Sequence, residues 1–74
     1  MDLTTFLGRL GASRISYRLD RVRDATVVVV AVPGERWEVE FMDEGGVEVE
    51  MFRSDGTMAD ASALGALFAR EETV

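Results

Sequence analysis

The stretch that decides the fold runs Arg36-Trp-Glu-Val-Glu-Phe-Met-Asp-Glu-Gly-Gly-Val-Glu-Val-Glu-Met-Phe-Arg53. It has the pattern of a β-hairpin, with two arms joined by a glycine turn. Apolar residues alternate with glutamates on each arm, as Trp37, Val39 and Phe41 on the first and Val47, Val49 and Met51 on the second. Because successive side chains of a strand point to opposite faces, each arm has one apolar and one acidic face.

The length of the turn sets the pairing of the two arms. A two-residue turn at Gly45-Gly46 would place Phe41 opposite Glu50 and mix apolar with acidic residues on one face. A three-residue loop over residues 43–45, with Gly45 in the left-handed conformation, instead pairs Phe41 with Val47. This register predicts four glutamates on one face of the sheet, with like charges directly opposite each other. They are Glu38, Glu40, Glu48 and Glu50.

The remaining chain predicts two helices and two further strands. Asp2 can cap a helix over residues 3–10, and Gly11 suits the position after its end. Period-two alternation indicates a strand over 15–22, and the continuous apolar run over 25–32 indicates a central strand that is buried on both faces. Pro33-Gly34 fits a tight turn into the hairpin. Asp60 can cap a closing helix over 61–70.

These elements predict one α+β domain over residues 1–74, with the order α-β-β-β-β-α. The sheet is expected to be a four-stranded antiparallel meander, and both helices are expected to pack on its apolar face. The expected strands are 15–22, 25–32, 36–42 and 47–53. The turn after the central strand sets Val27 and Val29 beside Glu40 and Glu38 on the other face, which gives an apolar strip bordered by carboxylates.

Composition removes several kinds of chemistry. The chain of 74 residues has 14 acidic and 8 basic residues, a net charge of −6, and neither histidine nor cysteine. Nucleic acids and anionic membranes are therefore disfavoured partners, and the commonest general base and metal ligands are missing. We expect no catalytic residues, no metal and no cofactor.

The expected cellular location follows from the lack of a recognisable secretory signal or membrane span in the sequence. The first residues form neither a basic nor an apolar segment of a secretory signal, and the longest apolar run is far shorter than the ~20 residues of a membrane span. We expect a cytoplasmic protein.

The hairpin also carries a resemblance. The order of elements, with Val-Pro-Gly-Glu-Arg at 32–36, the Glu-Val alternation and Ser-Asp-Gly at 54–56, resembles small uncharacterised bacterial proteins associated with immunity proteins of toxin-immunity systems. The resemblance implies that the chain binds and neutralises one toxin, often a nuclease with a cationic active site.

From the residues, the first hypothesis is a non-enzymatic acidic module that binds a protein with a basic surface, with the four glutamates as the charged part of its interface and Val27 and Val29 as the apolar part. The second is a homodimer that buries the same face, and the third is an enzyme that uses these carboxylates. The alternative without a function is a solvated sheet surface.

Overall fold

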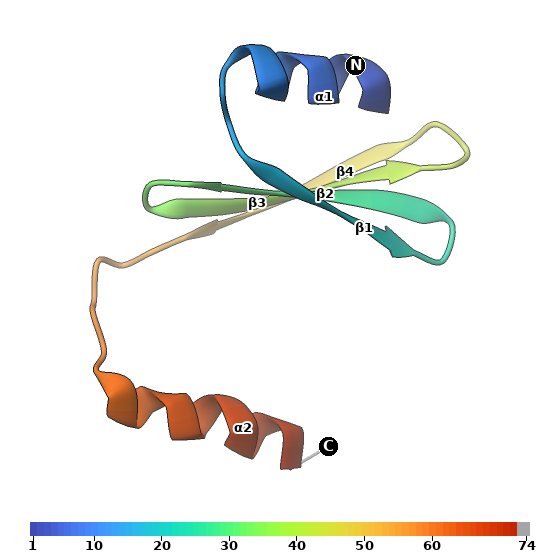
Figure 1. Cartoon of the computed structure of the whole chain (residues 1–74). Coiled ribbons are helices and arrows are strands. Elements are labelled where there is room, and N and C mark those ends of the chain that lie inside the picture. The colour runs from blue at the N-terminus through green and yellow to red at the C-terminus, as the bar shows by residue number, and fades with distance from the viewer. Residues whose placement is uncertain (73–74) are drawn as a thin grey trace.

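The chain forms a four-stranded antiparallel sheet with one helix before it and one after it, in a computed structural model that describes residues 1–72 and the side chains of residues 1–69 (Figure 1). This arrangement confirms the predicted α-β-β-β-β-α order. The elements are α1 (Leu3–Ala12), β1 (Tyr17–Val22), β2 (Ala25–Val32), β3 (Glu35–Met42), β4 (Val47–Arg53), the short 3₁₀ helix η1 (Ala61–Ala63) and α2 (Leu64–Glu72).

The sheet is a meander in which each strand pairs with its neighbours along the chain, in the order β1-β2-β3-β4. Its register is the predicted one: Val30 pairs with Trp37, and Phe41 pairs with Val47. The β2–β3 and β3–β4 turns depend on glycine, because Gly34 has a φ of 78° and Gly45 a φ of 106°, in the region that side chains disfavour.

The core lies between α1 and one face of the sheet, which we call the inner face. Its buried residues are Leu10 from α1 and Val28, Val30, Val39 and Phe41 from β2 and β3. The rings of Phe6 and Phe41 lie 5.5 Å apart and join the helix to the sheet. Trp37 packs against this cluster and is partly buried.

The end of α1 differs from the expectation. The helix continues past Gly11 to Ala12, and Arg14 takes the left-handed conformation with a φ of 56°. The Arg14 N–H donates to Gly11 O at 3.1 Å, and the Ile15 N–H donates to Leu10 O at 2.9 Å. These two hydrogen bonds form a Schellman motif, which holds Ile15 in the helix end and delays the start of β1 to Tyr17.

The expected position of the second helix was wrong. α2 does not cover the inner face, but lies on the side of the sheet opposite α1, at the end of a linker over residues 54–60 (Figure 1). Hydrogen-bonded turns shape this linker: Gly56 N–H donates to Ser54 Oγ at 3.0 Å, and Thr57 N–H donates to Asp55 Oδ1 at 2.8 Å. Periodicity predicts a helix and its apolar side, but not the path of the loop before it.

The detached helix gives the chain an open shape. The radius of gyration is 15.3 Å, whereas about 11 Å is usual for a folded chain of this length. Neither helix, over the described residues, has the length and apolar character needed to cross a membrane.

Candidate functional site

The predicted quartet of glutamates lies together on the face of the sheet opposite α1, which we call the open face. Glu38 pairs directly with Glu50, and Glu40 pairs directly with Glu48. The two glutamates of edge strand β4 are exposed, whereas those of β3 are half-buried. The strand pairing therefore holds four carboxylates in a fixed array on two adjacent strands.

Two guanidinium groups share the open face with the carboxylates. Arg36 Nε lies 3.6 Å from Glu38 Oε2, and its guanidinium lies 4.3 Å from the centre of the Phe52 ring. The register places Arg18 beside Val29 and Asp20 beside Val27 on the same face. The open face thus carries five carboxylates and two guanidinium groups. Its net charge is negative, and the excess of carboxylates lies toward β4.

The apolar part of this face differs from the prediction in one residue. Val29 is partly exposed, but Val27 is only 8% exposed because Asp20 and Glu40 flank it on the neighbouring strands. Phe52, at the end of β4, is 37% exposed and supplies apolar surface that the sequence interpretation did not use. In the sequence, Phe52 interrupts the alternation of apolar and acidic residues directly after Met51, and this could have indicated an apolar residue on the glutamate face.

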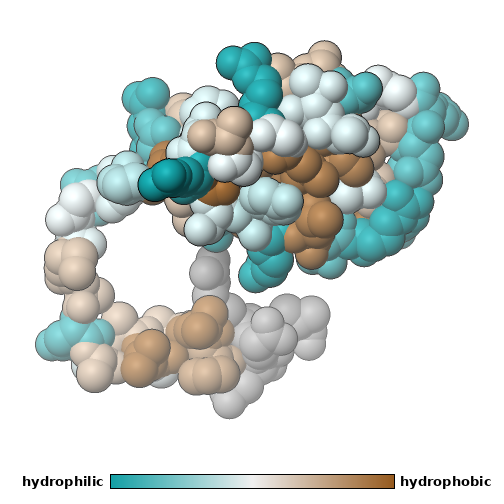
Figure 2. All heavy atoms as spheres, turned by 45° about the horizontal axis from the view of Figure 1, so that its top comes forward, coloured by the Kyte–Doolittle hydropathy of each residue, from teal (hydrophilic) through white to brown (hydrophobic). Residues whose placement is uncertain are grey.

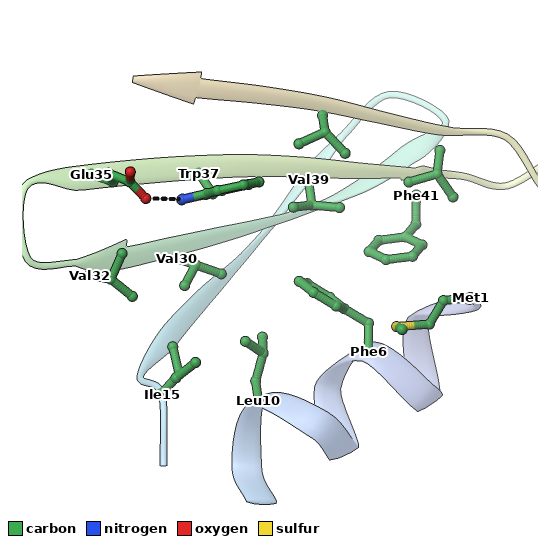
Figure 3. A pocket seen from close by; sticks show the side chains of 12 residues that line it. Met1, Phe6, Leu10, Ile15, Val30, Val32, Glu35, Trp37, Val39 and Phe41 are labelled. Carbon is green, nitrogen blue, oxygen red and sulfur yellow. Dashed lines mark hydrogen bonds between the residues drawn. The ribbon is translucent and has the colours of Figure 1, made fainter. Parts of the chain in front are cut away.

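A second surface lies on the inner face, where the sheet is wider than α1. A hollow of about 520 Å³, which we call the apolar groove, runs between α1 and strands β3 and β4 (Figure 3). Met1, Phe6, Leu10 and Ile15 line its helix side (Figure 3). Val30, Val32, Glu35, Trp37, Val39, Phe41, Val47 and Val49 line its sheet side. The sequence did not predict this groove, because the second helix was expected to fill it.

One carboxylate borders the apolar groove. Trp37 Nε1 donates a hydrogen bond to Glu35 Oε1 at 3.0 Å (Figure 3). Arg53 Nε lies 3.5 Å from Glu35 Oε2. Glu35 was missed because the strand was predicted to begin at residue 36. One residue more would have placed Glu35 on the same face as Trp37, two residues away.

An ion pair outside both surfaces ties β1 to the β3–β4 turn. Arg21 Nη1 donates to Asp43 Oδ1 at 2.8 Å, Nη2 donates to Asp43 Oδ2, and Thr26 Oγ1 accepts from Nη1 at 3.2 Å. The hydrogen bonds from Arg21 hold the pKa of Asp43 below its ordinary value, and the carboxylate in turn raises the pKa of Arg21. The Arg21 guanidinium thus serves to hold β1 against the β3–β4 turn.

Among the described side chains of residues 1–69, no three acidic groups come together in a cluster that could hold a metal ion. The chain matches no model of a known protein family, no curated protein and no solved structure. The function of the chain is therefore inferred from the open face and the apolar groove alone.

Proposed function

We propose that the chain is a non-enzymatic, acidic protein-binding module whose open face binds a protein with a basic surface. The observation that carries the proposal is the direct pairing of Glu38 with Glu50 and of Glu40 with Glu48. Like charges across a strand pair are unfavourable in the free protein, and a bound cationic group between them would relieve the repulsion. Val29 and Phe52 supply the apolar contacts beside this array, and Val27 supports them from beneath.

The resemblance to immunity proteins suggests which basic protein to test. A toxin with a cationic active site, such as a nuclease, would be attracted by the acidic face and covered by it. The proposed setting is the cytoplasm, where an immunity protein would meet its toxin. A toxin gene beside the gene for this chain would support this partner.

Self-association through the open face is a weaker proposal. Two copies placed face to face would bring the two glutamate arrays together, and the shielding of Val27 leaves little apolar surface to offset their repulsion. The charge of this face therefore favours an unlike partner.

The test is binding of a basic protein encoded beside this chain, measured as association rate against salt. Replacing Glu48 and Glu50 together by Gln should slow association at low salt by about tenfold or more and flatten the salt dependence. The matched control replaces Glu44 by Gln and Asp24 by Asn, which removes the same charge from two turns. Equal rates for both double variants at low salt would contradict the proposal.

A further inference from the structure

The apolar groove and helix α2 are complementary parts of one chain that lie on opposite sides of its sheet. None of the described side chains fills the groove between α1 and β4, where Val47 and Val49 are exposed. The apolar side of α2 lacks a surface to cover: Leu64, Leu67 and Phe68 are 61%, 56% and 64% exposed. Figure 2 shows hydrophobic surface on the C-terminal segment, apart from the main body of the protein.

The inner face has room for a second helix. Strands lie about 4.8 Å apart, so the outer strands of a four-stranded sheet are about 14 Å apart, whereas packed helices need about 10 Å between their axes. α1 packs on the middle of the sheet through Phe6 and Leu10. A helix beside α1, with its axis about 10 Å away, would therefore lie over edge strand β4 and cover the exposed valines of the groove.

The linker favours a helix from another molecule. Its hydrogen-bonded turns at residues 54–57 lead α2 away from the groove of its own chain (Figure 1). A helix that extends from its own domain while a groove of matching character stays open is the arrangement of a subunit that exchanges an element with a second copy. We infer that two copies of the chain form a dimer in which α2 of each lies in the apolar groove of the other.

Reciprocal exchange also provides enough contact area. A nine-residue helix is about 14 Å long and about 10 Å across, so burying one side removes about 300 Å² from the helix and a similar area from the groove. One docked helix thus buries about 600 Å², below a stable specific interface. Two exchanged helices bury about 1,200 Å², which reaches the lower end of that class.

The dimer and the proposed partner binding use different faces and respond oppositely to salt. Each copy has a net charge of −6, so salt should strengthen the dimer by screening the repulsion between copies. Salt should weaken the binding of a basic partner to the open face. Failure of one proposal therefore leaves the other standing.

The first test is sedimentation of the full chain over a range of micromolar concentrations. We expect twice the mass of one chain, with a dissociation constant that falls as salt rises. Phe68→Glu should weaken the dimer at least about 30-fold, the effect of losing a central apolar anchor. The control Ala66→Glu adds the same charge about 200° around the helix, away from the apolar side, and should leave the dimer intact.

The second test distinguishes exchange from any other dimer. Val49→Glu blocks the groove but leaves α2 intact, whereas Phe68→Glu blocks α2 but leaves the groove intact. Each variant alone should be monomeric. An equal mixture should associate weakly through the one docked helix that remains, so its average mass should rise above that of either variant only at the highest concentrations. Both residues are mostly exposed in the monomer, so circular dichroism should show folded variants.

Three results would overturn the inference. The first is a wild-type chain that stays monomeric at every concentration and salt, and the second is a dimer that Phe68→Glu and Ala66→Glu affect equally. The third is a mixture of Val49→Glu and Phe68→Glu that associates no more than either variant alone at the highest concentrations. Because the first result needs no variant, the inference can fail even if a substitution disturbs folding.

Discussion

Two arginines occupy backbone conformations that glycine would adopt with less strain. Arg14 ends α1 with a φ of 56°, and Arg23 sits in the β1–β2 turn with a φ of 50°. The left-handed region costs a residue with a side chain about 1–2 kcal/mol. In a domain this small, a cost of that size is a large share of the total stability.

Arg14→Gly should raise the free energy of unfolding by about 1 kcal/mol, because it removes the strain and preserves both hydrogen bonds of the Schellman motif. Urea denaturation of the two proteins measures the difference. The matched control is Arg9→Gly, the same substitution inside α1, which should lower stability by about 1 kcal/mol. A loss of stability in both variants would show that the Arg14 side chain has an unrecognised contact.

At the scale of single elements, the ends of helices and strands are fixed by short polar contacts. Asp2 accepts from the Thr5 N–H at 2.8 Å and starts α1, and Asp60 accepts from the Ser62 N–H at 3.0 Å and starts η1. The Arg21–Asp43 pair joins edge strand β1 to the β3–β4 turn. The hydrogen bonds favour the ionised carboxylates and lower the pKa values of Asp2, Asp43 and Asp60, so these contacts depend on pH.

The Arg21–Asp43 pair should make the fold sensitive to acid. The hydrogen bonds from Arg21 lower the pKa of Asp43, so the pair stabilises the fold fully above the ordinary aspartate pKa and loses its contribution as pH falls through the lowered value. Titration of the Asp43 carboxyl by NMR should give a pKa below the ordinary range. Arg21→Gln should return that pKa toward the ordinary value, and an unchanged titration would contradict the assigned cause.

Local pattern was enough to predict the elements and the glutamate array, because period-two alternation and the glycine turns set register directly. Val47 could face Phe41 in only one turn geometry that kept Glu48 and Glu40 on the other face. The path of residues 54–60 carries no such periodic constraint, so the position of α2 did not follow from the sequence. The apolar groove was missed for the same reason.

At the scale of the whole molecule, a single helix covers a four-stranded sheet, and the core is correspondingly thin. Val28 is the one side chain with no exposed surface among the described residues. It lies at the centre of the sheet, between Leu19 and Val39 on the neighbouring strands. A core of this size supplies only about 3–5 kcal/mol, so each buried group matters.

Val28→Ala should therefore remove about 2–3 kcal/mol, a large share of the total stability, because it leaves a cavity that the rigid strands cannot close. Urea denaturation should show a midpoint shifted strongly to low denaturant. Val22→Ala, at a valine that is 46% exposed, should cost about 0.5 kcal/mol or less. Equal losses at the two valines would mean that β2 does not form the centre of the core.

Trp37, which is hydrogen-bonded to Glu35 at the rim of the apolar groove, is an intrinsic fluorescent reporter for that groove. Trp37 is the sole tryptophan of the chain, so all indole fluorescence comes from that one position. Water reaching the ring shifts its emission to longer wavelengths, and an apolar neighbour shifts it back. Binding of a helix or any other ligand in the groove can therefore be followed by the emission wavelength of Trp37, without an added dye.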